Sequence, residues 1–175
     1  MIICLLGKPG CGKDTLCEKL QNATVLTTGA LYRKEYELKT PFGIEAASYW
    51  LKGDLCPNDM TNELMRNYIV NYRSDLLVVL NGYPRRLNQA EFLDSIVKVD
   101  LAIDLCCPDN VIIERMLKRG RVEETNEVIA KRLEVYSENN QPIVDYYRSS
   151  KRYKLINSNQ EIHKVYEDFL GKINE

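Results

Sequence analysis

Short apolar segments recur along the chain and are separated by longer stretches whose apolar residues follow helical spacing. Five segments rich in aliphatic residues predict strands, at residues 2–6, 24–27, 76–80, 99–105 and 153–156. Strands that alternate with helices are typical of an α/β fold with a mainly parallel central sheet. We therefore expect one sheet covered by helices.

Two regions between these strands are helical. From Gly29 to Arg73 the pattern predicts helices without a strand, broken at 40–43 and 53–57, and thus a helical insertion on one edge of the sheet. After the fourth strand a helix is expected from Pro108 through Leu117, interrupted at Gly120. Helical spacing resumes over 122–136, and Gln141-Pro142 predicts the next break because proline lacks an amide hydrogen.

Size and charge narrow the functional classes. The chain has 175 residues, which suits a single domain over residues 1–175, and its 24 Lys and Arg residues balance 25 Asp and Glu residues. This near-neutral charge argues against a general nucleic-acid or membrane-surface binder. Because no apolar run approaches the roughly 18 residues that span a bilayer and no signal peptide is recognisable, we expect a cytoplasmic location. A monomer is also expected.

The cysteines do not form a C-x-x-C pair, and several lie in apolar strand patterns. They are Cys4, Cys11, Cys17, Cys56, Cys106 and Cys107. Buried reduced thiols are therefore expected, rather than disulfides or a zinc site. Cys11 is the exception, because a thiol in a glycine-rich loop near a helix N-terminus can be open to alkylation or oxidation.

The segment after the first predicted strand carries the clearest chemistry. Gly7 and Lys13 are spaced as in G-x-x-x-x-G-K, within Gly7-Lys8-Pro9-Gly10-Cys11-Gly12-Lys13-Asp14-Thr15. Glycines there let backbone N–H groups surround a polyphosphate, the lysine reaches its outer oxygens, and the N-terminus of the following helix attracts the same anion. Since a strand precedes the loop and helical spacing follows it, a nucleotide-phosphate site is favoured over a purely structural turn.

One position departs from the usual motif. Asp14 stands where Ser or Thr usually gives a hydroxyl to magnesium, and Thr15 follows one residue later. The first turn of a helix favours a carboxylate, but a neighbouring phosphate repels it. We therefore expect the Asp14 side chain to point away from the phosphates.

Arginines stand beside glycine in three further segments. These are Thr28-Gly29-Ala30-Leu31-Tyr32-Arg33, Gly82-Tyr83-Pro84-Arg85 and Arg119-Gly120-Arg121, with Arg132 a few turns further on. A guanidinium fork pairs with two phosphate oxygens at once, and several forks can neutralise two facing phosphate chains. Solvated surface charge is the ordinary alternative, but this placement favours phosphate clamping.

These motifs together resemble the adenylate kinase family of nucleoside monophosphate kinases, almost from end to end. The resemblance rests on Gly7 to Thr15, Thr28-Gly29 with Arg33, Gly53-Asp54-Leu55-Cys56-Pro57, Gly82 to Arg85 with Gln89, and the segments 115–121 and 131–136. It implies a three-layer P-loop kinase fold with a five-stranded parallel sheet. It also implies a helical insertion that binds the monophosphate, at residues 28–57, and a very short lid at 119–123.

The resemblance implies transfer of the γ-phosphoryl group of ATP to AMP, giving two ADP. This chemistry needs positioning and charge neutralisation more than covalent help. The implied catalytic residues are Lys13, Arg85, Arg119, Arg121 and Arg132. ATP would lie against Gly10, Cys11, Gly12, Lys13, Asp14, Thr15, Arg119 and Gln160. AMP would lie against Thr28, Arg33, Asp54, Leu55, Cys56, Gly82, Arg85, Gln89, Arg121 and Arg132.

Gln89 bears on the acceptor base. A carboxamide offers a donor and an acceptor together, so it can pair with N1 and the amino group of adenine. Related UMP/CMP kinases typically have Asn at this position, and Gln89 therefore favours AMP. An ordinary glutamine on a helix surface is the alternative.

The lid that this resemblance implies is short, because only Gly120 separates Arg119 from Arg121. On a continuous helix these two side chains would point to nearly opposite sides, so the arrangement predicts a helix interruption at Gly120. The zinc-binding cysteines of some long lids have no counterpart here. No structural zinc and no metal site built from protein side chains are expected.

Magnesium is expected to enter with ATP and to be held through water near Asn81. The family usually has Asp at this strand end, and Asn keeps a carbonyl acceptor but lacks the charge. Asp104, at the end of the fourth predicted strand, either compensates for Asn81 or has a buried or capping role. Gln160 stands where many relatives have Gly near the donor adenine, which leaves donor selectivity open.

Two other functions remain open. Asn81 and Asp14 fit a nucleotide-binding protein of low activity that senses or sequesters adenylates. Retention of all the arginines favours a kinase instead, because sensing needs no transition-state clamp. A UMP/CMP-type kinase is the second alternative, and Gln89 is the residue that speaks against it.

Overall fold

A five-stranded parallel sheet forms the centre of the molecule. The computed structural model describes residues 1–70 and 77–175. The strands are β1 (Ile2–Gly7), β2 (Ala23–Thr27), β3 (Leu77–Asn81), β4 (Leu101–Cys106) and β5 (Tyr153–Asn157), in the spatial order β2-β3-β1-β4-β5. Every pairing in this sheet is parallel. The predicted strands and fold class are confirmed to within two residues at each end, except at residue 76, which lies outside the described residues.

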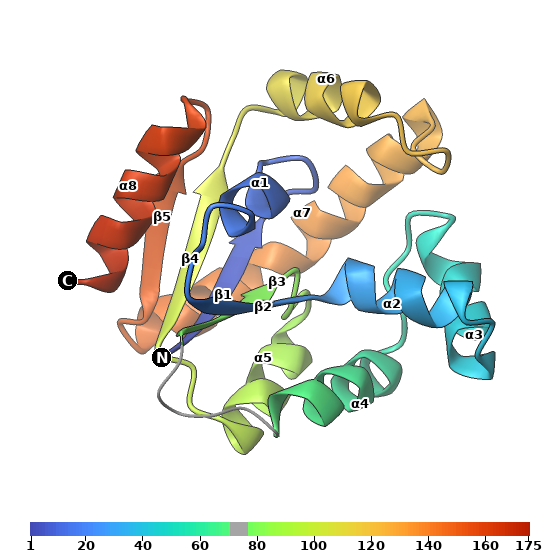
Figure 1. Ribbon diagram of the computed structural model, residues 1–175, viewed down its shortest axis with the longest axis horizontal. Coiled ribbons are helices and arrows are strands. Elements are labelled where there is room, and N and C mark those ends of the chain that lie inside the picture. Colours follow the sequence, from blue (N-terminus) through green and yellow to red (C-terminus); the bar gives the residue numbers. More distant parts are fainter. Residues whose placement is uncertain (71–76) are drawn as a thin grey trace.

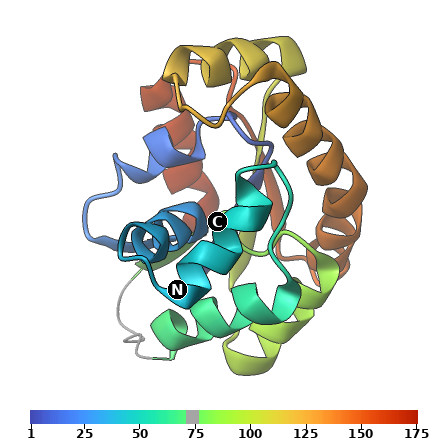
Figure 2. The same ribbon diagram turned by 90° about the vertical axis from the view of Figure 1, so that its right-hand side faces the viewer.

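Helices cover both faces of the sheet and one edge (Figure 1). They are α1 (Lys13–Cys17), α2 (Thr28–Glu37), α3 (Pro41–Trp50), α4 (Asn58–Ile69), α5 (Leu87–Ile96), α6 (Asp109–Arg119), α7 (Asn126–Ser149) and α8 (Ile162–Ile173). The segment between β2 and β3 is helical throughout its described part, as predicted. The end of that prediction, residues 71–73, lies outside the described residues. Figure 2 views the molecule from the side of α2 and α3.

The alternation of side chains along β1 creates two cores. Ile2, Cys4 and Leu6 point to one face of the sheet, where side chains of α4, α5 and α7 pack against them. Ile3 and Leu5 point to the opposite face, which is covered mainly by α1, α6 and α8. A strand that is buried on both faces reads as a continuous apolar run, and this explains why residues 2–6 show no polar position.

The helical insertion has a small core of its own. Tyr32, Ala46, Cys56 and Leu64 are buried together between α2, α3 and α4. Helices α2 and α3 approach so closely at Gly43 that a Cβ atom added there would lie 2.2 Å from the carbonyl carbon of Glu35. Glycine is therefore needed at this contact for its small size.

Gly120 ends α6, as predicted. Its backbone is left-handed, with φ 65° and ψ 30°, a conformation that glycine adopts without steric cost. The prediction that helical structure resumes at Val122 is wrong, because α7 begins at Asn126. The Thr125 side chain accepts a hydrogen bond from the Val128 amide at 3.3 Å and so caps the helix at this later position.

The predicted break at Pro142 is also wrong. Helix α7 continues through Pro142 to Ser149 and buries Ile143, Val144 and Tyr147. A proline inside a helix costs about 3 kcal/mol relative to alanine. Burial of three large side chains beyond the proline offsets that cost, since each contributes about 1.5–3 kcal/mol.

The six cysteines are free, and Cys4, Cys11, Cys56 and Cys107 are buried. Cys11 has an exposed fraction of 0%, so the expectation that its thiol is open to reagents is wrong for this conformation. The tight phosphate loop folds back over its sulfur. Among the described helices, none has a stretch both long and apolar enough to cross a bilayer.

The Gly43 contact gives a stability prediction. The variant Gly43→Ala forces a methyl group into the backbone of α2, and we expect it to lower the free energy of unfolding by about 1–3 kcal/mol. The matched control is Gly171→Ala in α8, where an added Cβ meets no atom within 4 Å. Alanine is the better helix former, so this control is expected to stabilise the protein by about 0.5–1 kcal/mol. Urea denaturation of both variants measures the difference, and equal effects would contradict the close approach.

Candidate active site

A cavity of about 800 Å³ lies at the carboxyl ends of the strands, between the phosphate loop, the helical insertion and the lid. Ligands of open α/β sheets bind at this edge. All predicted site residues line it: Gly10, Cys11, Gly12, Lys13, Asp14, Thr15, Thr28, Arg33, Asp54, Leu55, Cys56, Gly82, Arg85, Gln89, Arg119, Arg121, Arg132 and Gln160. Segments far apart in sequence therefore share one site.

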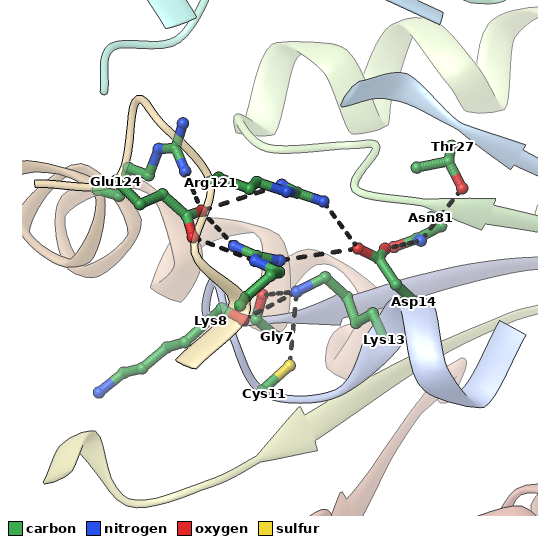
Figure 3. Close-up of polar contacts among 11 residues, drawn as sticks. Gly7, Lys8, Cys11, Lys13, Asp14, Thr27, Asn81, Arg121 and Glu124 are labelled. Atoms are coloured by element: carbon green, nitrogen blue, oxygen red, sulfur yellow. Dashed lines mark hydrogen bonds and ion pairs between the residues drawn. The ribbon is translucent and has the colours of Figure 1, made fainter. Parts of the chain in front are cut away.

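The phosphate loop joins β1 to α1 and wraps around the Lys13 side chain. Gly10 and Gly12 have positive φ values of 82° and 102°, which turn the loop tightly. The Lys13 ammonium group donates hydrogen bonds to the carbonyl oxygens of Gly7, at 2.6 Å, and Lys8, at 2.8 Å (Figure 3). These contacts hold the ammonium group at the wall of the cavity.

A buried carboxylate gathers the arginines of the lid. The Glu124 side chain is only 1% exposed and accepts hydrogen bonds from Arg119 and Arg132, the latter at 2.6 Å. Arg121 approaches the same carboxylate at 3.9 Å. Glu124 is not among the residues predicted from sequence. The signal that could have identified it is the acidic Glu123-Glu124 pair, which begins two residues after Arg121.

Asp14 faces into the cavity, so the prediction that it points away is wrong. One carboxylate oxygen accepts a 2.7 Å hydrogen bond from the Asn81 amide (Figure 3). The other lies 3.5 Å from Arg121 and 3.8 Å from Arg119. The hydrogen bond from Asn81 and the two nearby guanidinium groups hold the carboxylate in this direction. Both guanidinium groups approach this one carboxylate, so the side chains of Arg119 and Arg121 point in the same direction. The predicted helix interruption at Gly120 allows this.

The pKa values of the site reflect crowded positive charge. The protein atoms that crowd around the Arg85 guanidinium group, followed by the positive charge of Arg132, lower the pKa of Arg85, although the side chain is open to the cavity. Burial lowers the pKa of Arg121 as well, and Arg119 and Arg33 add to this effect. Burial alone would raise the pKa of Asp14, but the hydrogen bond from Asn81 and the nearby Lys13 and arginines lower it overall. The cavity therefore favours anionic ligands.

Gln89 is held firmly in the wall of the cavity near the helical insertion, the side predicted to bind the acceptor. It is 2% exposed, so the alternative of an ordinary surface glutamine is wrong. Its carbonyl oxygen accepts the Arg85 amide hydrogen at 2.8 Å, and its amide nitrogen donates to Asn58 at 3.0 Å. Asn58 and Arg86, whose guanidinium group donates to the Cys56 carbonyl at 2.9 Å, form a supporting layer that the sequence analysis did not identify.

The other acceptor-side residues surround this layer. The Thr28 hydroxyl group donates to the Asn81 carbonyl at 3.3 Å, which ties the start of α2 to the end of β3. The Arg85 side chain bends back so that its Nε donates to the Gly82 carbonyl at 2.9 Å. The remaining predicted residues of this side, at 33 and 54–56, lie on the insertion wall of the cavity.

Gln160, predicted to lie near the donor nucleotide, lines the cavity together with the phosphate loop. Its amide donates to the Asn157 carbonyl at 2.9 Å and to Asp168 at 2.7 Å, so the side chain is fixed at the rim. Arg115 is a cation that was not assigned a role from sequence. It lines the same cavity and donates to the Ser158 carbonyl at 3.3 Å.

Asp104 is a buried residue and does not compensate for the missing charge at Asn81. It is 6% exposed, accepts hydrogen bonds from the hydroxyl groups of Tyr153, at 3.0 Å, and Tyr136, at 3.4 Å, and is not among the residues that line the cavity. Burial is the main cause that raises its pKa. It is therefore poorly placed to replace a charge at Asn81.

The donor set fits a magnesium ion that arrives with a nucleotide. The Thr15 hydroxyl group and the Asp14 carboxylate bring hard oxygen donors to the phosphate loop, and the Asn81 amide nitrogen holds the carboxylate. Among the described residues, no group of three or more His, Cys, Asp or Glu side chains could hold a metal ion. Magnesium suits such a site, because it keeps several waters and shares phosphate oxygens with one or two carboxylates.

Comparison with known proteins agrees with this geometry. The sequence profile described as "Adenylate kinase" matches residues 5–152. An adenylate kinase from Nocardia farcinica is 38% identical over 156 residues, which cover 84% of this chain and 86% of that protein. One from Mycobacterium tuberculosis is 37% identical over 157 residues, with 85% and 86% covered. One from Prochlorococcus marinus is 31% identical, with 96% of each chain covered.

The burial of Glu124 leads to a second stability prediction. Glu124→Gln removes the charge that balances Arg119 and Arg132, and we expect the free energy of unfolding to fall by about 1–3 kcal/mol. Glu114→Gln is the matched control, since Glu114 pairs with Lys118 on an exposed surface where such a pair contributes less than about 0.5 kcal/mol. Chemical denaturation at pH 7 compares the two, and a loss for Glu124→Gln no larger than that of the control would show that its carboxylate does not organise the lid.

Proposed function

This chain belongs to the adenylate kinase family, and we propose that it transfers the γ-phosphoryl group of ATP to AMP, forming two molecules of ADP. Members of the family are ATP-dependent phosphotransferases, and the chain is a nucleoside monophosphate kinase. The observation that carries the assignment of roles is the convergence of cations. Seven lysine and arginine residues within the described part of the chain line one cavity: Lys13, Arg33, Arg85, Arg115, Arg119, Arg121 and Arg132.

The donor phosphates occupy the phosphate loop. Backbone N–H groups of the loop face the anion, and the Lys13 ammonium group exchanges its contacts with Gly7 and Lys8 for the outer phosphate oxygens. Arg119 meets the same phosphates from the lid. Gln160 lies at the rim, where the donor base leaves the cavity.

The acceptor lies against the helical insertion. Arg33 and Arg85 hold its monophosphate, and the base reaches Gln89. Each end of the Gln89 amide keeps one further hydrogen-bonding position, because the nitrogen has two hydrogens and the oxygen two lone pairs, and the contacts with Asn58 and Arg85 use one of each. The amide is thereby held in one orientation and still offers a donor and an acceptor to adenine. This supports AMP over a pyrimidine monophosphate.

The transferring group passes between the two phosphate sites. Negative charge spreads over its equatorial oxygens in the transition state, so the protein contributes mainly fixed positive charge. Arg132, which donates a 2.6 Å hydrogen bond to Glu124, and Arg121, which lies 3.9 Å from the same carboxylate, are suited to this task. Magnesium, when it is bound with ATP, neutralises donor phosphate charge.

The sensing alternative predicts binding without turnover. Its motivation was the pair Asn81 and Asp14, and the structure brings these two side chains into contact at the phosphate loop. Arg121 and Arg132 line the cavity and lie beside the buried Glu124 carboxylate. This supports the kinase, because a sensor has no transition state for such arginines to stabilise.

The arginines provide the first test of function. We expect Arg85→Ala and Arg121→Ala each to lower kcat by on the order of 100-fold, as for the loss of one preorganised charge at a transition state. Lys118→Ala is the control, because Lys118 precedes Arg119 in sequence but is 75% exposed and pairs with Glu114 instead. Steady-state rates of ADP formation decide the matter, and losses below tenfold in both arginine variants would count against the assignment.

The acceptor provides the second test. Diphosphate formation is measured with ATP and, in turn, AMP, CMP, UMP or GMP. We expect AMP to give the highest kcat/KM, and Gln89→Ala to lower that value by about tenfold or more, since a site that hydrogen-bonds a base loses its match when the amide is removed. A preference for CMP or UMP would establish the pyrimidine kinase instead. Nucleotide binding without product from any acceptor would establish the sensor.

A further inference from the structure

The Asp14 carboxylate lies where a polyphosphate would repel it. It follows Lys13 directly in the loop, lines the cavity, and its side chain is 48% exposed. Two negative groups a few ångströms apart repel each other, and the repulsion is stronger in a partly dry site than in bulk water. A phosphate site therefore binds an anion better without such a carboxylate, unless a cation lies between the two.

The fold nevertheless fixes this carboxylate at the loop. Asn81, at the carboxyl end of β3 and 2% exposed, donates a 2.7 Å hydrogen bond to one oxygen of Asp14. The same amide donates to the Thr27 hydroxyl group at 3.2 Å, so its direction is set from the neighbouring strand. Figure 3 shows Asp14 between Asn81 and Arg121. The negative charge is thus held by the sheet and is not a mobile surface group.

We propose that Asp14 and Asn81 act as a pair that binds the hydrated magnesium ion accompanying ATP, with Asp14 supplying the charge and Asn81 holding it in place. The inference rests on the proposed function, because the ion enters with the nucleotide. Magnesium favours oxygen ligands and retains water, and one carboxylate beside the phosphates suits it. In the nucleotide-free protein, Arg119 and Arg121 balance the charge of Asp14.

Other carboxylates are less suited to this role. Among the described residues, Glu18, Asp54 and Glu161 also line the cavity. Asp54 belongs to the insertion wall, and Glu161 follows Gln160 at the rim. Glu18 lies one helical turn after Asp14 and is exposed, which makes it a matched control for the loss of one negative charge.

The test separates the charge from its position. Calorimetry gives the Kd of ATP in EDTA and in excess Mg²⁺, and their ratio is the enhancement by magnesium. Asp14→Asn keeps the size of the side chain and the hydrogen bond from Asn81 but removes the charge, and we expect the enhancement to fall about tenfold, equal to about 1.4 kcal/mol. The double exchange D14N/N81D moves the charge to the strand end with the same atoms, and we expect it to restore the enhancement to within about threefold of the wild-type value.

A second readout uses Mn²⁺ in place of Mg²⁺. Electron paramagnetic resonance of Mn²⁺ in the complex with ATP reports the ion directly, and we expect weaker binding of the ion in Asp14→Asn and recovery in the double exchange. Glu18→Gln is expected to leave both the calorimetric ratio and the Mn²⁺ affinity within about twofold of the wild-type values, because long-range screening weakens the effect of an exposed charge.

Two results would overturn the inference. If Asp14→Asn tightens ATP binding equally in EDTA and in Mg²⁺, Asp14 serves only to pair with the lid arginines. If Glu18→Gln lowers the enhancement as much as Asp14→Asn, the effect is general charge and not a placed ligand. Absence of ATP binding by the wild-type protein under both conditions would instead defeat the proposed function, and this inference with it.

Discussion

The active site must offset the mutual repulsion among its positive side chains. Cations from the phosphate loop, the insertion, the segment after β3 and the lid line one cavity, and removal from water, followed by the charge of neighbouring arginines, lowers the pKa values of Arg85 and Arg121. Anionic partners offset this repulsion. The chain supplies those partners itself: Glu124 for the lid arginines and loop carbonyls for Lys13.

The sheet determines that these charges meet. Parallel strands release their loops at the same edge, so the segments after β1, β2 and β3 reach the cavity although they are distant in sequence. Burial of β1 on both faces fixes the direction of the phosphate loop. Gly120 then turns the chain at the end of α6, and Arg119 and Arg121 approach the same side as a result. Backbone geometry therefore brings the charged side chains together at the cavity, and the arginines supply the positive charge.

Local patterns predicted this backbone well, and tertiary contacts explain where they failed. The apolar runs, the glycine loop and the arginine segments each carry their signal within a few residues. Pro142 predicts a helix end because the free-energy cost of a proline in a helix follows from the residue itself. The burial of Tyr147 beyond it depends on tertiary contacts, which the sequence does not display. The orientation of Asp14 depends on Asn81, 67 residues away, and the sequence alone gives no sign of that contact. Glu124 escaped notice because an acidic residue near a lid normally suggests a solvated surface.

The two carboxylates near the lid differ in how they can respond to a substrate. Glu124 is 1% exposed and pairs with Arg119 and Arg132, so breaking these pairs would leave buried charges uncompensated, and we expect them to persist when a substrate binds. A guanidinium group has five N–H donors, which allows Arg132 to keep Glu124 and still meet a phosphate. Asp14 is 48% exposed and pairs with the arginines only at 3.5–3.8 Å, so a phosphate can displace it from them. Glu124 thus orders the arginine side chains, while the weaker contacts with Asp14 leave Arg119 and Arg121 available to the substrate.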